Sequence, residues 1–279
     1  MTLIYHNSRQ HEIKRAIFYG CSNTAGTELP DADILGMTLE QVNEVKKNYV
    51  NKTTQWYTKL FSELPVNTAN KSKEYNRLCN RYSYARYLSD YLNVEYINFA
   101  EPGSSHKKIL FNILDHITTD FYQEGDVVFV AATSPLRDYI IDDNGHGLNF
   151  IMSHKETLLQ LSPLYESLIQ LNNDYYLALN NMIILKAIHD SLAVKNIQCI
   201  FIETHSYSEH ANGAFLNLPT KTDITKRLMQ TYRKILKEIR FAPGNLYLYQ
   251  GTFCGFGHAG PGMHKMFAMD LYKYLIEPK

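Results

Sequence analysis

Two short segments at opposite ends of the chain carry side chains that could act together as a nucleophile and its base. Ser22 lies in Gly20-Cys21-Ser22-Asn23-Thr24, and His258 opens a glycine-rich stretch that runs to His264. A serine hydroxyl becomes a nucleophile when a hydrogen-bonded imidazole accepts its proton. The pair therefore predicts attack on an acyl carbon. The alternative for Ser22 is a capping or turn residue whose hydroxyl satisfies backbone amides.

A third segment, Pro102-Gly103-Ser104-Ser105, follows a predicted strand. The amide of Gly103 could point into a site and help to hold an oxyanion. Pro-Gly is equally an ordinary turn dipeptide, with Ser104 or Ser105 capping the helix that follows.

The elements that must position these residues alternate along the chain. Short β-rich runs predict five strands, and helical periodicity fills the longer stretches between them. The predicted strands are Ala16–Gly20, Val94–Ala100, Asp126–Ala132, Ile197–His205 and Asn245–Gly251. The predicted helices include Tyr82–Leu92, Ile109–Ile117, Leu228–Ile239 and Met266–Tyr274. This alternation indicates an α/β protein, a three-layer α/β/α sandwich whose parallel sheet is covered on both faces.

The strands are unevenly spaced, which predicts a single domain over residues 1–279 with insertions around 31–80 and 133–160. The first insertion contains a predicted helix around Leu39–Leu64. The second begins with a polar loop, Thr133–Asn149, before a long predicted helix around Tyr165–Val194. Ligands of such sheets bind beyond the carboxyl ends of the strands. The loops at 20–26, 101–106, 133–137 and 252–264 are therefore expected to gather at one edge.

Composition restricts the class of protein. Lys+Arg and Asp+Glu both total 28, and this balance argues against a general nucleic-acid binder. No apolar run approaches the roughly 18 residues that span a bilayer, and Met1–Arg15 contains no apolar signal region. We expect a cytoplasmic protein with no membrane partner. The four cysteines form no CxxC pair, so neither a zinc site nor a disulfide framework is expected.

Histidine and cysteine residues near the proposed pair have alternative interpretations. His264 could be a helix-start histidine that hydrogen-bonds a backbone group, and the His258/His264 pair lacks a nearby third metal ligand. No metal or organic cofactor is therefore expected. Cys21 is predicted to pack as a small buried apolar residue, because a cysteine nucleophile needs a stabilised thiolate.

In their order and their placement after strands, the three segments resemble the SGNH hydrolase superfamily, also called GDSL esterases and lipases. The resemblance spans nearly the whole chain and implies a flavodoxin-like parallel sheet. It implies Ser22 as nucleophile and as an oxyanion-hole amide, with Gly103 as a second such amide. It also implies His258 as the catalytic histidine, six residues before the histidine of the last helix.

The chain departs from the family pattern at three places. Cys21 stands where the family has an aspartate before the serine. The loop after the third strand reads Ala131–Arg137, where the family has an oxyanion-binding asparagine. Gly255 and Phe256 occupy the positions of the aspartate that orients the histidine. Members with GCS and Ser-Pro-x-Arg segments of this kind are typical of bacteriophage genomes, so a phage origin, with a location in the host cytoplasm or the virion, is an expectation.

These departures require compensation if the site is to act on a substrate. Losing one oxyanion donor costs about 10²–10³ in turnover, and losing the orienting carboxylate costs about 10⁴. Ser134 is predicted as a replacement oxyanion donor. Arg137 is predicted to bind substrate, because its guanidinium suits an anionic group, although an ion pair with a neighbouring aspartate is the alternative. Ser104 and His264 are further predicted substrate contacts.

The sequence thus predicts a serine ester hydrolase that uses a Ser–His dyad or an incomplete triad. Its substrate is expected to be a small-molecule or carbohydrate ester, with a carbohydrate O-acetyl group as one candidate. Two alternatives stay open: a catalytically inactive binding or structural protein with the same fold, and an acyltransferase. The oligomeric state is not predicted.

Overall fold

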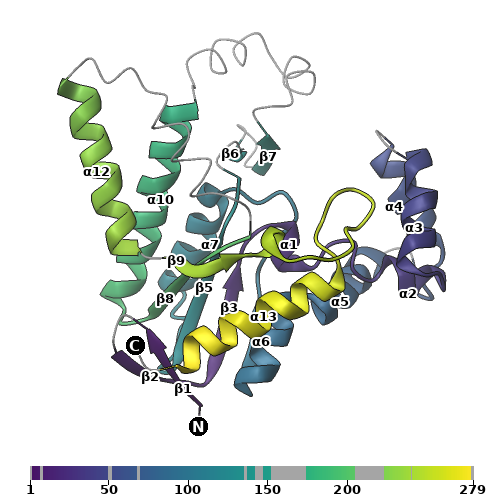
Figure 1. Ribbon diagram of the computed structural model, residues 1–279, viewed down its shortest axis with the longest axis horizontal. Coiled ribbons are helices and arrows are strands. Elements are labelled where there is room, and N and C mark those ends of the chain that lie inside the picture. The colour runs from purple at the N-terminus through teal and green to yellow at the C-terminus, as the bar shows by residue number, and fades with distance from the viewer. Residues whose placement is uncertain are drawn as a thin grey trace.

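At the centre of the computed structural model is a five-stranded parallel sheet with the strand order β4-β3-β5-β8-β9 (Figure 1). The structure describes residues 2–6, 9–49, 52–67, 70–134, 137–141, 147–151, 174–204, 223–239 and 241–277. The strands of this sheet are β3 (Arg15–Tyr19), β4 (Glu95–Asn98), β5 (Asp126–Ala132), β8 (Gln198–Glu203) and β9 (Phe241–Asn245). Taken in chain order, they lie as 2-1-3-4-5, the flavodoxin-like arrangement, so the predicted fold class is confirmed.

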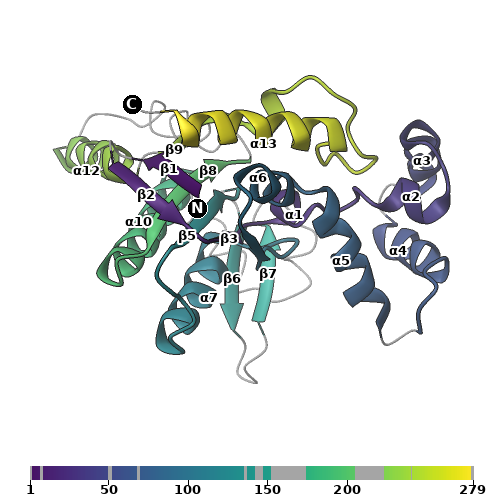
Figure 2. The ribbon, with the colours of Figure 1, turned by 90° about the horizontal axis from the view of Figure 1, so that it is seen from below.

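Helices cover both faces of the sheet and complete the three layers (Figures 1 and 2). One face packs against α6 (Tyr84–Leu92) and α13 (Pro261–Ile276). The other packs against α7 (His106–Thr118), α10 (Asp174–Val194) and α12 (Asp223–Ile239). Side chains alternate between the faces of a strand. In β3, for example, Phe18 joins the core under α6 and α13, whereas Ile17 joins the other core.

The last strand of the sheet lies earlier than the predicted Asn245–Gly251. It is β9, and the alternating apolar residues after it form a 3-10 turn, Leu246–Leu248. Leu246 is buried in the core with α13. Among the described strands, β9 pairs with β8 alone and irregularly, so Pro243, which has no amide hydrogen, is tolerated at this edge.

A group of helices between β3 and β4 has a small core of its own. It comprises α2 (Asp31–Leu35), α3 (Leu39–Lys46), α4 (Thr53–Ser62) and α5 (Lys71–Tyr82). Trp56 is fully buried among side chains from these helices, and Figure 1 shows α2, α3 and α4 beyond one end of α13. The single helix predicted over Leu39–Leu64 is wrong. The chain turns after α3 through a 3-10 segment, Lys47–Tyr49, and this lets α3 and α4 both contribute to the core around Trp56.

Two antiparallel hairpins lie outside the central sheet. β1 (Thr2–His6) pairs with β2 (Arg9–Ile13), a hairpin that the sequence did not predict. β6 (Arg137–Ile141) pairs with β7 (Gly147–Ile151), and this hairpin overlaps the predicted polar loop Thr133–Asn149, so that prediction is wrong in part. Residues 152–173 lie outside the described residues, and they include the start of the helix predicted over 165–194.

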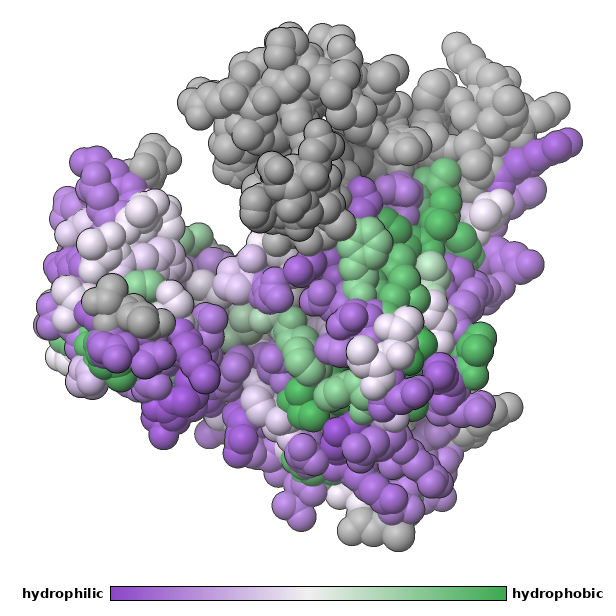
Figure 3. Space-filling model, turned by 180° about the vertical axis from the view of Figure 1, so that it is seen from behind, coloured by the Kyte–Doolittle hydropathy of each residue, from purple (hydrophilic) through white to green (hydrophobic). Residues whose placement is uncertain are grey.

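The surface over α7 and α10 exposes several apolar side chains. Figure 3 shows apolar side chains gathered on this side among mostly polar ones. They include Phe111 and Leu114 on α7 and Ile183 on α10. Among the described helices, none is both long and apolar enough to cross a membrane.

Candidate active site

Ser22 is held at the carboxyl edge of the sheet by the turn that follows β3. It is the first residue of the short helix α1 (Ser22–Ala25). Strand order reverses between β3 and β5, and this is where ligands of flavodoxin-like sheets bind. Glycine is required at position 20 because the side chains of Thr24 and Ala131 lie close to its backbone. A Cβ there would lie 2.2 Å from Thr24 Oγ1 and 2.9 Å from the Ala131 Cβ. The φ of Gly20 is not positive, so lack of space rather than backbone conformation requires glycine here.

A tight turn before α13 presents His258 to Ser22. The Gly257 N–H donates to the Cys254 carbonyl at 2.8 Å, and the Cys254 N–H donates to the His258 carbonyl at 2.8 Å. The φ of +91° at Gly257 favours glycine in this turn. His258 Nε2 lies 2.8 Å from Ser22 Oγ, which is the distance of a hydrogen bond between a base and its nucleophile. The structure therefore brings together the two residues predicted to carry the chemistry.

A buried carboxylate completes a chain of hydrogen bonds through His258. Glu28 Oε2 hydrogen-bonds to His258 Nδ1, and the Glu28 side chain is 0% exposed, against 23% for His258. The three residues thus form the hydrogen-bonded chain of a triad, whereas the sequence predicted a dyad or an incomplete triad. Sequence reasoning missed Glu28 because it sought the acid just before His258. The signal was weak: an acidic residue among turn residues shortly after Ser22.

The backbone of Glu28 lies in the left-handed region, with φ of +72°. Such a conformation in a residue other than glycine costs about 1–3 kcal/mol and persists where the surroundings enforce it. The Glu28 N–H donates to the Tyr75 hydroxyl at 3.1 Å, and this contact helps to hold the conformation. With the backbone in this conformation, the Glu28 carboxylate reaches His258.

A lysine and a second carboxylate lie behind Glu28. The Lys46 ammonium forms ion pairs with Glu28 and, at 2.7 Å, with Asp31, and all three side chains are at most 1% exposed. Burial raises the pKa of Glu28, but the His258 hydrogen bond and the Lys46 charge outweigh it, so the Glu28 pKa lies below its usual range. Glu28 is therefore an ionised acceptor at neutral pH. The Phe256 N–H also donates to Glu28 Oε1, at 3.3 Å.

Asp31 and Lys46 are enclosed by polar donors and aromatic rings. Trp56 Nε1 and the Tyr75 hydroxyl donate to the Asp31 carboxylate at 3.1 and 2.8 Å. The Lys46 ammonium lies 5.0 Å from the Trp56 ring centroid and 4.9 Å from that of Phe256. Burial raises the pKa of Asp31 despite the neighbouring ammonium. Burial lowers the pKa of Lys46, but the two carboxylates outweigh it and raise that pKa overall.

Tyr247 connects the two catalytic segments. Its hydroxyl donates to the Gly257 carbonyl at 3.2 Å and accepts a hydrogen bond from Asn23 Nδ2 at 3.2 Å. Asn23 directly follows the candidate nucleophile, and Gly257 directly precedes the candidate base. Tyr247 thus holds the segment of Ser22 and the segment of His258 together through these two hydrogen bonds.

Gly103 lies in a type II turn, as the turn interpretation of Pro102-Gly103 predicts. The Ser104 N–H donates to the Glu101 carbonyl at 3.1 Å, and Gly103 has φ of +83°, as the third residue of such a turn requires. Ser105 caps α7 by accepting from the Lys108 N–H. Ser104 is buried, so its predicted contact with a substrate gains no support. The oxyanion role of the Gly103 amide stays a prediction.

His264 does not lie where a substrate could contact it. Its side chain is 1% exposed. Its Nδ1 accepts a hydrogen bond from the Tyr84 N–H at 2.9 Å. Burial lowers the pKa of His264 to about 3, against a hydrogen bond to the Ala259 backbone. The prediction of a substrate contact is therefore wrong, and the helix-start interpretation, with the ring bonded to backbone groups, is correct.

The segment after β5 carries Ser134, predicted as a replacement oxyanion donor, and Arg137, predicted to bind substrate and placed as the first residue of β6. Ser134 is partly exposed there, while the side chain of Arg137 lies outside the described residues. The preceding Thr133 N–H donates to His106 Nε2 at 2.9 Å, and His106 Nδ1 lies 2.6 Å from Asn181 Oδ1. Because Nε2 accepts, Nδ1 carries the proton of a neutral ring. His106 thus anchors the start of this loop to α7 and α10.

Cysteine and metal chemistry receive no support from the described residues. Cys21 is fully buried next to Ser22, as predicted. Burial raises the pKa of Cys254 to about 12, which disfavours the reactive thiolate. Within the described ranges, no group of three or more His, Cys, Asp or Glu side chains is arranged to hold a metal ion.

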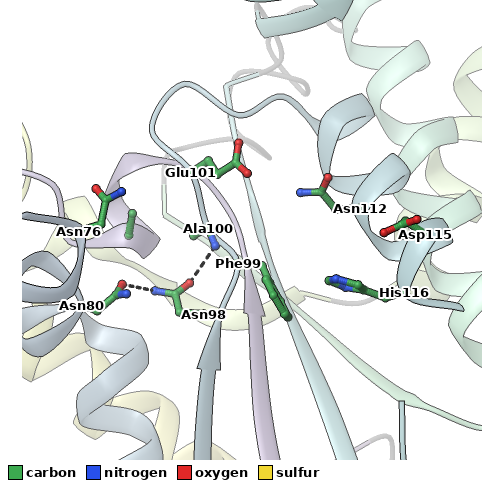
Figure 4. Close-up of a pocket in the computed structure, with 10 residues that line it drawn as sticks. Asn76, Asn80, Asn98, Phe99, Ala100, Glu101, Asn112, Asp115 and His116 are labelled. Atoms are coloured by element: carbon green, nitrogen blue, oxygen red, sulfur yellow. Dashed lines mark hydrogen bonds between the residues drawn. The ribbon is translucent and has the colours of Figure 1, made fainter. Parts of the chain in front are cut away.

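A polar pocket of about 380 Å³ lies beyond the end of β4, between α5 and α7 (Figure 4). Its wall includes the segment 98–101, which leads into the turn that carries Gly103. Asn98 is held by its own hydrogen bonds, donating to the Thr24 carbonyl and to Asn80. The lining residues are Ala25, Asn76, Asn80, Asn98, Phe99, Ala100, Glu101, Asn112, Asp115 and His116.

Comparisons with known proteins find similarity of structure alone. No model of a known protein family matches the chain, and no curated protein sequence matches it. A crystal structure of a lipolytic G-D-S-L family member from Veillonella parvula is 11% identical, with a TM-score of 0.41, over 93% of this chain and 97% of that one. A proposed lipolytic protein of the same family from Desulfitobacterium hafniense is 10% identical, with a TM-score of 0.43, over 94% and 99%. At such identities and TM-scores, neither structure carries an inference about what this chain does.

Proposed function

We propose that this chain is a serine ester hydrolase with Ser22 as nucleophile, His258 as general base and Glu28 as the orienting acid. One observation carries the proposal: His258 Nε2 lies 2.8 Å from Ser22 Oγ while Nδ1 is bonded to the buried Glu28 carboxylate. An ionised carboxylate can only accept a hydrogen bond, so the Nδ1 proton faces Glu28. The lone pair of Nε2 then faces the serine hydroxyl, as a general base requires.

The proposed reaction has two stages. Ser22 Oγ attacks the acyl carbon while His258 takes the hydroxyl proton, and His258 then gives that proton to the departing alcohol. Water, deprotonated by the same imidazole, next attacks the acyl-enzyme and releases the acid together with the free serine. Glu28 stays ionised throughout, because its lowered pKa keeps it deprotonated at neutral pH, and it stabilises the imidazolium.

Amides and hydroxyls at the carboxyl edge of the sheet would hold the oxyanion. The N–H groups of Ser22 and Gly103 are the proposed donors, and Ser134 is the proposed third donor from the loop after β5.

We propose that the sugar part of a carbohydrate ester binds in the pocket beyond β4, whose lining includes Ala25 of α1 but neither Ser22 nor His258. Carboxamides on α5 and α7, such as Asn76 and Asn112, and the carboxylates of Glu101 and Asp115 offer the acceptors and donors that sugar hydroxyls use. Phe99 adds an apolar ring surface (Figure 4). No lysine or arginine is among the described residues that line the pocket, so its chemistry suits a neutral polyhydroxylated ligand better than an anion.

The enzymatic proposal is tested with a fluorophosphonate probe and p-nitrophenyl acetate. We expect labelling of the wild type and none of Ser22→Ala. Hydrolysis should fall by about 10⁴–10⁶-fold in Ser22→Ala or His258→Ala and by about 10²–10⁴-fold in Glu28→Gln. Labelling that is absent, or that persists in Ser22→Ala, would mean a non-catalytic protein or another nucleophile. Added alcohol or sugar acceptors that divert product from free acid would identify an acyltransferase.

The substrate class is tested by comparing an O-acetylated oligosaccharide with p-nitrophenyl acetate. In Asn76→Ala/Asn112→Ala we expect KM to rise about thirtyfold for the oligosaccharide, since two hydrogen bonds are lost and each loss weakens binding by about 1 kcal/mol. Hydrolysis of the small ester should not change, because it does not fill the pocket. If the substitutions impaired hydrolysis of both substrates equally, the pocket would not be the sugar-binding site.

A further inference from the structure

The three charged groups behind His258 form one closed cluster. Lys46 is paired with both Glu28 and Asp31, and the cluster is shielded from water by Trp56 and Phe256. Removing charges from water is costly unless they are compensated. Lys46 is buried between two carboxylates, and one of them, Glu28, contacts the proposed catalytic base. This arrangement indicates a role in addition to packing.

The formal charges of the cluster give that role. With both carboxylates ionised beside the Lys46 ammonium, Glu28 and Asp31 contribute two negative charges and Lys46 one positive charge, so the cluster next to His258 carries a net negative charge. Protonation of His258 brings the whole assembly to neutrality, and this is the state that arises when the serine is attacked. Without Asp31, the positive charge of Lys46 would cancel the negative charge of Glu28. The positive charge of the His258 imidazolium would then have no compensating negative charge in the cluster.

Other titratable groups around the cluster are neutral near pH 7. Tyr57, Tyr75, Cys79 and Cys254 face its carboxylates, and burial raises the pKa of each above its ordinary value. His264 faces His258, and burial lowers its pKa to about 3. Among the described residues, the field at His258 is therefore set by Glu28, Lys46 and Asp31.

Lys46 also fixes the direction of the Glu28 carboxylate. It binds Oε1 together with the Phe256 N–H, and this leaves Oε2 for His258. The lysine stem packs against the turn that carries His258, where a Cβ added at Gly255 would lie 2.4 Å from Lys46 Cδ. Lys46 thus contacts Glu28 through its ammonium and the turn that carries His258 through its stem.

We propose that Asp31 and Lys46 are positioning residues for His258: Lys46 aims the Glu28 carboxylate, and Asp31 offsets the lysine charge so that Glu28 can stabilise the imidazolium. This inference rests on the proposed function, in which His258 is the base. It adds two residues that neither contact Ser22 nor reach the reacting atoms.

The test follows the His258 ring by NMR titration in a Ser22→Ala background, so it requires no turnover. Asp31→Asn should lower the titration midpoint of His258 by about one pH unit, because one nearby negative charge is lost. Adding Lys46→Met to Asp31→Asn should return the midpoint to the Ser22→Ala value, because Glu28 then faces His258 alone. If Asp31→Asn does not fold, Asp31→Ala removes the same charge and leaves room for water.

A matched control is Asp126→Asn, which breaks another ion pair of low exposure, with Arg15 at the start of β3. It should lower stability and leave the His258 midpoint in place. An Asp31→Asn midpoint equal to that of the background, or a double variant shifted further than the single one, would overturn the inference. In the Ser22-intact enzyme, the acid limb of kcat/KM should move with the NMR midpoint. Failure of the hydrolase proposal would instead appear as absent labelling with the titration shifts intact.

Discussion

Individual side chains at this site have roles that their sequence neighbours do not reveal. Glu28 supplies the carboxylate for His258 from a left-handed backbone position, 230 residues away along the chain. His264, only six residues from His258, is instead a buried acceptor for the Tyr84 amide. His258 in the turn and His264 in the first turn of α13 thus differ in role, because His258 contacts Ser22 whereas His264 is buried in the core.

Burial of neutral His264 predicts a pH dependence of stability. Its pKa is about 3 in the folded chain and about 6.5 when unfolded. The unfolded state therefore binds more protons between these values, and stability falls as pH drops from about 6.5 toward 3. Urea unfolding of the wild type should show this loss. In His264→Asn, which retains an acceptor and does not titrate, the slope over this range should be smaller. Equal slopes would exclude His264 as the source.

At the scale of elements, the junction between β3 and α1 is the most constrained part of the site. Ser22 starts a helix of four residues, and Gly20 just before it lies against Thr24 of that helix and Ala131 of β5. Its position therefore depends on the space around Gly20, whereas the position of His258 depends on a turn with positive φ at Gly257.

Gly20→Ala should disturb this junction. A Cβ at Gly20 would lie 2.2 Å from Thr24 Oγ1, so α1 must shift, at a cost of about 1–3 kcal/mol. We expect a lower free energy of unfolding and a lower kcat, because Ser22 moves with the helix. The matched control is Gly262→Ala in α13, where an added Cβ meets nothing within 4 Å. The control should preserve both quantities, and equal losses in the two variants would contradict the steric explanation.

At the scale of the molecule, the site joins the sheet to the helical unit beside it. The nucleophile follows β3, the base precedes α13, and the charges behind the base come from α2 and α3. The helices that the sequence marks as an insertion therefore contribute to the electrostatics of the site. Whether residues 1–279 form one domain stays a prediction.

Much of the architecture could be predicted because its causes are local. Four of the five predicted strands match β3, β4, β5 and β8 within one or two residues at each end, since short β-rich runs bounded by turns produce them. The prediction of β9 failed because the apolar pattern Leu246–Tyr249 packs against α13 through a turn rather than in the sheet. The two hairpins were missed because each of their strands has only five residues, too few for a clear alternating pattern.

The sequence by itself determined the order of elements, the parallel α/β sheet and the placement of Ser22 and His258 after their strands. Periodicity and turn residues act over a few positions, so a sequence displays them directly. Only the tertiary structure decided which carboxylate meets His258, that Lys46 and Asp31 lie behind it, and that His264 is buried. Those outcomes depend on contacts between residues far apart in the chain, and the burial that raises or lowers their pKa values exists only once the layers have packed.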